Sequence, residues 1–179
     1  MTTFDLESLI VDIPDYPEPG VIFKDITPLL ADPEGFKACV DDIAQHFAGK
    51  GITKVVGAEA RGFMIGAPVA YALGVGFVPA RKPGKLPREC YRQSYDLEYG
   101  TDTLEIHKDA ISSDDVVLVV DDLIATGGTA AADVQLIQQT GAKIAGLAFM
   151  LELTVFKPRE VIAKVTDAEF YSQVQVETY

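Results

Sequence analysis

The stretch Val116-Val-Leu-Val-Val-Asp-Asp-Leu-Ile-Ala-Thr-Gly-Gly-Thr129 decides the fold class of this chain. It begins with a run of branched apolar residues, which is typical of a strand buried on both faces of a parallel sheet. Asp121 and Asp122 stand where that strand is expected to end, and residues 130–137 follow with a helical pattern. This order of strand, turn and helix predicts an α/β fold with a central parallel sheet flanked by helices.

The turn at residues 126–129, Thr-Gly-Gly-Thr, has the composition of an anion-binding site. Glycines let the backbone approach a phosphate closely, and the free N–H groups and dipole at a helix start favour negative charge there. Open parallel sheets also place ligands at the carboxyl ends of their strands. An ordinary turn with a threonine N-cap is the alternative; the paired acids in front of the turn favour a phosphate site.

The composition predicts one soluble domain spanning residues 1–179, with 48% hydrophobic and 23% charged residues. A net charge of −12 argues against a nucleic-acid partner, which would need a basic stripe. The two cysteines, Cys39 and Cys90, and the two histidines, His46 and His107, form no metal-ligand pattern. The first residues lack the basic and apolar regions of a signal peptide, so we expect a cytoplasmic protein.

Residues 62–80 carry no formal charge and are close to the length of a membrane span. They also contain several glycines and prolines, with Tyr71 in the middle. We therefore expect a buried helix to about Leu73 and then a strand at residues 75–80, and no membrane partner.

Other segments have clear local patterns. Thr3 can cap a predicted short helix in which Leu6, Leu9, Ile10 and Ile13 repeat at helical spacing. The prolines of residues 14–20 predict an extended connection after this helix. An N-cap acid and a proline open a helix at residues 32–34. The remaining predicted strands cover residues 54–58 and 143–151, with one or two short edge strands within 165–176.

A second charged turn, Glu59-Ala-Arg-Gly-Phe63, joins the strand at residues 54–58 to the next helix. An arginine beside a glycine at a helix start suits a diphosphate, because the guanidinium fork can bridge two oxygens. The alternative is a surface salt bridge between Glu59 and Arg61.

Residues 81–92 contain five of the fifteen basic residues against one acid, and their prolines and glycine predict a loop. In so acidic a chain this concentration favours anion capture over a solvated loop without a role. Residues 94–100 and 103–107 alternate in the manner of a β-hairpin, with Glu98 just before its turn.

With these motifs in place, a resemblance can be stated. Residues 116–129 resemble the signature of the type I phosphoribosyltransferases, which use 5-phosphoribosyl diphosphate. Residues 16–28, 59–63, and 81–87 with 94–100 resemble the corresponding segments of the adenine phosphoribosyltransferases, bacterial members most of all. The likeness covers about residues 4–153, and the tail after Leu153 matches no pattern of the family.

The resemblance implies a type I phosphoribosyltransferase fold in which residues 1–33 form a hood that recognises the base and residues 81–107 form a mobile catalytic loop and hairpin. It implies purine salvage, in which the phosphoribosyl group is transferred to N9 of adenine to give AMP and diphosphate. It also implies a homodimer, and Mg²⁺ as cofactor, held mainly by substrate and water rather than directly by the protein.

The family pattern assigns roles residue by residue. The catalytic residues would be Glu98, as general acid/base, and Asp121 and Asp122, which would meet the ribose hydroxyls and the positive charge that develops on the sugar. The ligands of 5-phosphoribosyl diphosphate would be Ala125, Thr126, Gly127, Gly128, Thr129, Ala60, Arg61, Arg81, Lys82 and Lys85. Adenine would lie against Phe23 and Arg61 and be read by backbone groups of Ile22 and Lys24.

Some alternatives stay open at the level of sequence. Composition alone favours plain core filling for Phe23. Lys24 stands where some members of the family have arginine, and Pro83 stands where some have a basic residue. A transferase for 6-oxo purines would need a donor aimed at the 6-oxygen, and a non-catalytic regulator of the same fold would normally add a DNA-binding segment or lose the catalytic loop.

Overall fold

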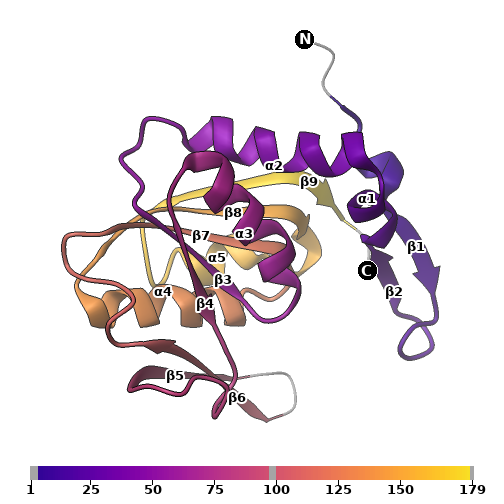
Figure 1. Cartoon of the computed structure of the whole chain (residues 1–179). Coiled ribbons are helices and arrows are strands. Elements are labelled where there is room, and N and C mark those ends of the chain that lie inside the picture. The colour runs from indigo at the N-terminus through magenta and orange to yellow at the C-terminus, as the bar shows by residue number, and fades with distance from the viewer. Residues whose placement is uncertain (1–3, 97–99, 178–179) are drawn as a thin grey trace.

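The computed structural model describes residues 4–96 and 100–177. Its centre is a five-stranded sheet in which every neighbouring pair of strands is parallel. The strand order is β4 (Gly76–Ala80), β3 (Lys54–Ala58), β7 (Val116–Ile124), β8 (Lys143–Leu153) and β9 (Glu169–Val176). The predicted α/β fold class with a flanked parallel sheet is therefore confirmed (Figure 1).

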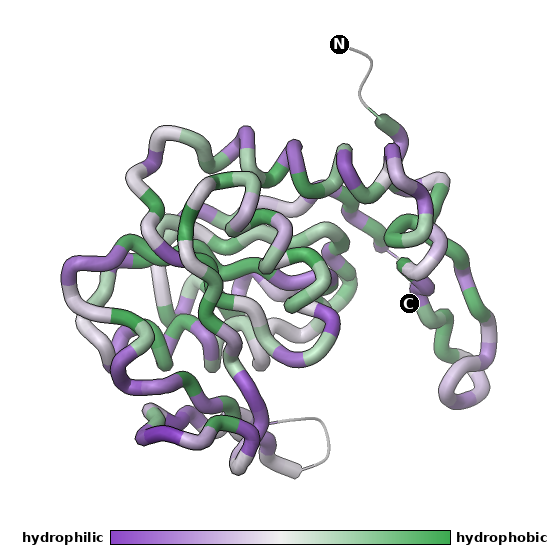
Figure 2. Tube along the Cα trace, in the orientation of Figure 1, coloured by the Kyte–Doolittle hydropathy of each residue, from purple (hydrophilic) through white to green (hydrophobic). Residues whose placement is uncertain are grey.

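Helices cover both faces of this sheet. On one face lie α2 (Pro33–Phe47) and α3 (Arg61–Leu73), and on the other lie α4 (Gly128–Thr140) and the short α5 (Pro158–Ile162). Because successive side chains of a strand point to opposite faces, β7 supplies both cores: Leu118 and Val120 pack toward α2 and α3, Val117 and Val119 toward α4. Figure 2 shows the hydrophobic residues concentrated along these central strands.

Local signals explain where the main helices begin and end. The Asp32 carboxylate accepts hydrogen bonds from the N–H groups of Glu34 (3.1 Å) and Gly35 (2.7 Å), which caps α2 as the sequence predicts. Gly74 directly follows α3 and Gly141 directly follows α4, and each glycine caps its helix in the left-handed conformation that favours glycine. Residues 62–80 form most of α3 and then β4, and no described helix is long and apolar enough to cross a membrane.

Two antiparallel hairpins extend from the central sheet. Strands β5 (Cys90–Asp96) and β6 (Thr101–His107) pair beside α4, so the predicted hairpin is present but starts earlier, inside the expected basic loop. Strands β1 (Val11–Pro14) and β2 (Ile22–Asp25) pair near the other end of the sheet, next to α1 (Thr27–Ala31).

The prediction of a helix near the N-terminus is wrong. Among the described residues, only Glu7–Leu9 form a short 3₁₀ turn (η1), and Val11–Pro14 form β1 instead. The physical reason is a distant partner: Ile13 pairs with Phe23, and Asp12 pairs with Lys24 across the hairpin. The tail is also more regular than expected, with the 3₁₀ turn η2 (Thr154–Phe156), then α5, then β9 as one strand paired with β8.

Candidate active site

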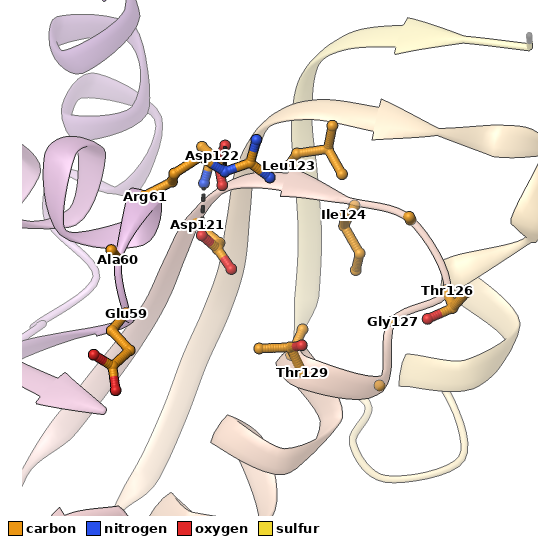
Figure 3. A pocket seen from close by; sticks show the side chains of 13 residues that line it. Glu59, Ala60, Arg61, Asp121, Asp122, Leu123, Ile124, Thr126, Gly127 and Thr129 are labelled. Atoms are coloured by element: carbon orange, nitrogen blue, oxygen red, sulfur yellow. Dashed lines mark hydrogen bonds and ion pairs between the residues drawn. The ribbon is translucent and has the colours of Figure 1, made fainter. Parts of the chain in front are cut away.

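A cavity of about 270 Å³ opens at the carboxyl ends of β3 and β7, where an open parallel sheet is expected to bind its ligands. Two strand–turn–helix units supply its wall, one from each strand (Figure 3). Its lining consists of Glu59, Ala60, Arg61 and the continuous segment from Asp121 to Ala130. The structure thus brings together the two charged turns that lie about sixty residues apart in the sequence.

The turn between β7 and α4 contributes the predicted anion-binding residues. Ala125, Thr126, Gly127, Gly128 and Thr129 all line the cavity. Gly127 has φ of 89°, a value that favours glycine, and α4 begins at the next residue. The N–H groups of the first turn of α4 have no partner within the helix, so they are available to an anion at this end.

The acidic pair lies on the opposite side of the cavity from this turn (Figure 3). The N–H of Asp122 donates to Oδ1 of Asp121 at 2.9 Å, while Oδ2 of Asp122 lies 3.1 Å from Nε of Arg61. Burial, reinforced by the neighbouring Asp122 charge, raises the pKa of Asp121 well above its usual value. Before any ligand binds, Asp121 therefore resists carrying a negative charge beside Asp122.

Gly62 makes room for the Asp121 carboxylate. A Cβ atom at Gly62 would lie 2.7 Å from Oδ1 of Asp121, well inside contact distance. A side chain at this first turn of α3 would force the carboxylate to rotate and break its hydrogen bond with Asp122.

Replacing Gly62 by Ala is expected to lower kcat for the proposed reaction by about tenfold or more, because catalytic groups act only near their productive geometry. Gly66→Ala is the matched control: it adds the same methyl group one turn along α3, against Phe77 and Val120 rather than Asp121. Steady-state kinetics and thermal unfolding of both variants give the comparison. Equal kcat losses in the two variants would show that packing, and not Asp121, is responsible.

The turn after β3 is organised by ion pairs that differ from the predicted alternative. Glu59 does not pair with Arg61. Its carboxylate accepts from Nη2 of Arg81 at 3.0 Å and, over a very short contact, from the N–H of Lys82. Although burial raises it, these hydrogen bonds hold the pKa of Glu59 below its usual range. Glu59 therefore ties the start of the basic segment to the cavity wall, a role that no sequence pattern indicated.

The predicted cations of the basic segment do not line the cavity. Arg81 pairs with Glu59, Nζ of Lys82 lies 3.0 Å from Asp102, and Lys85 is exposed. The hydrogen bond and charge of Asp102 raise the pKa of Lys82. In this structure the candidate diphosphate ligands Arg61, Arg81 and Lys82 are each paired with a carboxylate of the chain itself.

Hairpin residues that sequence reasoning missed connect this segment to the phosphate turn. Oγ1 of Thr129 lies 3.4 Å from the hydroxyl of Tyr95, which in turn lies 3.4 Å from Asp102. The β-like alternation around Tyr95 predicted a strand and gave no sign of this contact, which depends on docking β5 against α4. Glu98, the candidate acid/base on the same hairpin, lies outside the described residues.

The residues predicted to recognise the base lie on β2, outside the cavity lining. The guanidinium of Arg61 lies 5.9 Å from the ring centroid of Phe23, so the structure brings the base and diphosphate candidates together. The ring of Tyr16 packs edge-on against Phe23, with centroids 5.2 Å apart. The buried side chain of Lys24 points away into an ion pair with Asp12 at 2.6 Å, so only backbone groups of Ile22 and Lys24 remain for reading a base.

The described residues contain no cluster of three or more acidic, histidine or cysteine side chains that could bind a metal. Two carboxylates face the cavity from the end of β7, and buried Oδ2 of Asp122 accepts no well-formed hydrogen bond within the described chain, although it is ion-paired with Arg61. Such an oxygen can accept a hydrogen bond from a hydroxyl group or face a cation whose other ligands come from substrate and water. The residues present therefore fit a Mg²⁺ ion that is bound mainly by the substrate.

Comparison with known proteins agrees with this geometry. Residues 26–177 match the family model described as the phosphoribosyl transferase domain. The chain is 59% identical over 148 residues to the adenine phosphoribosyltransferase of Aeromonas salmonicida, covering 83% of this chain and 82% of that one. The chain belongs to the phosphoribosyltransferase family and, within it, to the adenine phosphoribosyltransferases.

Solved structures are similar over almost the whole chain. The adenine phosphoribosyltransferase of Thermoanaerobacter pseudethanolicus matches with a TM-score of 0.90 and 44% identity, over 96% of this chain and 98% of that one. The Giardia lamblia enzyme, solved with 9-deazaadenine, matches with a TM-score of 0.92 and 38% identity over 99% of both chains. The likeness therefore extends beyond Leu153, and the expectation that the tail lies outside the family pattern is wrong.

Proposed function

We propose that this chain transfers the phosphoribosyl group of 5-phosphoribosyl diphosphate to N9 of adenine, forming AMP and diphosphate in purine salvage. The observation that carries the proposal is the single cavity in which the acidic pair of β7, the turn opening α4 and Arg61 meet. A sugar phosphate needs these groups together: N–H donors for the phosphate, carboxylates beside the ribose and a cation for the diphosphate.

Different residues contact the 5-phosphate, the ribose and the diphosphate of the substrate. Backbone N–H groups of residues 125–129 and the hydroxyls of Thr126 and Thr129 hold the 5-phosphate. Asp121 and Asp122 accept hydrogen bonds from the ribose 2- and 3-hydroxyls, and stabilise the positive charge that develops as the bond to diphosphate breaks. Ala60 supplies a backbone contact, and Arg61, Arg81, Lys82 and Lys85 stabilise the departing diphosphate.

Two of the proposed diphosphate ligands must change ion-pair partners when the substrate binds. Arg81 and Lys82 must leave Glu59 and Asp102 to reach a diphosphate, since neither lines the cavity as described. Movement of the segment 81–107 over the substrate would bring them there and exclude water, which would otherwise hydrolyse the activated sugar. A Mg²⁺ ion held mainly by the substrate and water, beside Asp121 and Asp122, would supply additional charge neutralisation for the leaving group.

The base is held at β2. Phe23 offers one aromatic face to the purine, near Arg61. β2 pairs with β1, and within the described sheets no strand covers its other edge. Backbone groups of Ile22 and Lys24 on that edge can therefore read the edge of adenine, as a backbone pattern of donors and acceptors distinguishes it from 6-oxo purines.

Glu98 is proposed to exchange the proton at adenine N9 once the hairpin closes. Glu98→Gln should therefore lower kcat by about a hundredfold or more while leaving the affinity for 5-phosphoribosyl diphosphate within about twofold, since general acid–base catalysis is worth roughly 10²–10⁴. Single-turnover AMP formation measures the first quantity and titration calorimetry the second. A variant with unchanged turnover removes Glu98 from the mechanism.

The reaction itself is tested with the purified protein, Mg²⁺, 5-phosphoribosyl diphosphate and each of adenine, hypoxanthine, guanine and xanthine. Nucleotide formation is followed by absorbance and chromatography. AMP formation with adenine, far above the rate with any 6-oxo purine, is expected. Activity with guanine and none with adenine would make the chain a 6-oxo purine enzyme, and binding without turnover of any base would make it a regulator.

Two further assignments accompany this function. We place the protein in the cytoplasm, as expected from its sequence. We also propose a homodimer, because Met64 and Tyr71 on α3 are exposed large hydrophobic residues, Tyr71 to 89%. Sedimentation of the wild-type protein and of Tyr71→Glu tests the dimer: a monomeric wild type contradicts it.

A further inference from the structure

The turn at residues 125–129, which is proposed to hold the 5-phosphate, packs on its outer side against residues from the C-terminal part of the chain. A Cβ atom at Gly127 would lie 3.3 Å from Cβ of Val161 and 3.4 Å from the carbonyl oxygen of Pro158. Gly127 also lines the cavity on its other side. Helix α5 therefore packs directly behind the middle of the turn that is proposed to hold the 5-phosphate.

Helix α5 is too short to be stable without tertiary contacts, since a helix of five residues forms barely more than one turn. Its second residue, Arg159, provides such a contact with Glu152 at the end of β8. Nε of Arg159 donates to Oε1 at 2.9 Å and Nη2 donates to Oε2 at 2.7 Å, a bidentate pair. The exposed fraction of Glu152 is only 1%, so this carboxylate depends on its partners.

The last strand strengthens the same pair. The hydroxyl of Ser172 on β9 donates to Oε2 of Glu152 at 2.6 Å and accepts from Nη2 of Arg159 at 3.2 Å. The guanidinium also lies 4.3 Å from the ring centroid of Phe170 on β9. Arg159 is therefore fixed by β8 and β9 together, and through it α5 has a defined position relative to the sheet.

A second link joins this segment to the phosphate helix itself. Nε2 of Gln138, near the end of α4, donates to the carbonyl oxygen of Val165 at 2.8 Å, and Ile162 is buried in the core beside α4. The segment after β8 thus contacts α4 near its C-terminal end and, through Val161, the turn at its start. Movement of the turn away from the cavity would require α5 to move as well.

We infer that Arg159 is a positioning residue for the 5-phosphate: its pair with Glu152 holds α5 as a wall that fixes the Gly127 turn in its anion-binding geometry. Arg159 does not line the cavity, so it acts through Val161 and Pro158. N–H groups that are already held in place bind an anion without an ordering cost. If α5 no longer holds the Gly127 turn in place, that cost returns and the affinity for the anion falls. The inference rests on the proposed seat of the 5-phosphate in residues 125–129.

The test compares variants of Arg159 and Val161 in the full-length protein. Arg159→Met should raise the KM for 5-phosphoribosyl diphosphate by about tenfold or more, while the KM for adenine changes by less than about twofold. Arg159→Lys keeps the positive charge but cannot form the bidentate contact with Glu152. Its KM for 5-phosphoribosyl diphosphate should therefore lie between those of the wild type and Arg159→Met. Val161→Trp should raise the same KM by crowding the turn, without disturbing the Arg159–Glu152 pair.

Two controls make the outcome decisive. Glu160→Gln removes the exposed partner of Lys157 on the same helix and should leave both KM values unchanged. Thr129→Val alters the turn directly and should raise the KM for 5-phosphoribosyl diphosphate. If Thr129→Val has no effect, the proposed phosphate seat is wrong. If Thr129→Val raises that KM while Arg159→Lys and Val161→Trp, both folded, leave it unchanged, the positioning role of Arg159 is overturned.

Discussion

Replacing Asp121 and Asp122 together by Asn is expected to lower kcat for AMP formation by about 10²–10³, the usual cost of removing a preorganised electrostatic contact to a transition state. Both carboxylates lie in the cavity, and burial already disfavours the charge on Asp121. The fold should therefore tolerate two neutral amides of nearly the same shape. The loss should appear in kcat more than in KM, because the carboxylates oppose a charge that exists fully only in the transition state.

The measurement is steady-state AMP formation beside thermal unfolding of the double variant. Asp114→Asn, which removes one exposed carboxylate two residues before β7, shows how much one unit of net charge away from the cavity changes the rate. Full activity in the double variant would exclude the proposed stabilisation of the sugar by these residues.

The second large effect concerns stability and comes from Asp133 on α4. The exposed fraction of this residue is 1%, and neither carboxylate oxygen has a hydrogen-bond partner among the described residues. Burial raises the pKa of Asp133 from 3.8 to about 8. An acid with a raised pKa holds its proton more tightly in the folded chain than in the unfolded one, so the folded state binds more protons between those two pH values.

The free energy of unfolding is therefore expected to fall as pH rises through this window, by about 1.4 kcal/mol per pH unit, or about 4 kcal/mol from pH 5 to pH 8. Asp133→Asn removes this titrating group and should remove its contribution to the slope, while Asp121, whose pKa is also raised by burial, keeps its own contribution. Urea denaturation at each pH measures it, with Asp114→Asn again correcting for net charge. Parallel pH profiles for the wild type and Asp133→Asn would contradict the prediction.

Much of the fold could be predicted because the decisive signals are local. The apolar run of β7, the glycines of the next turn and the cap at Asp32 each depend on neighbours in sequence. Reliance on local signals also explains why the helix predicted at residues 3–13 is wrong. Leu6, Leu9 and Ile10 do repeat at helical spacing, but residues 11–14 pair with β2 instead. Helical periodicity compares only residues close in sequence and therefore cannot detect this pairing.

The sequence predicts most of the residues that line the cavity but not the contacts that these residues make with the rest of the chain. The turn at residues 125–129, the acidic pair and Arg61 each carry their chemistry in the sequence, and the cavity unites them. Which acid pairs with which cation could not be foreseen, because Glu59 and Arg81 meet only when β3 and β4 lie side by side. The contact of Val161 with Gly127 spans about thirty residues and has no signature in either segment.

The ion pairs of the basic segment have a consequence for a chain with a net charge of −12. Arg61, Arg81 and Lys82 are already paired with carboxylates, so a diphosphate that binds these three cations as proposed must displace anions that the protein itself carries. These internal carboxylates compete with any incoming anion for the cations. We therefore expect weaker binding of a small anion such as chloride, which contacts one cation, than of a ligand that contacts several cations at once.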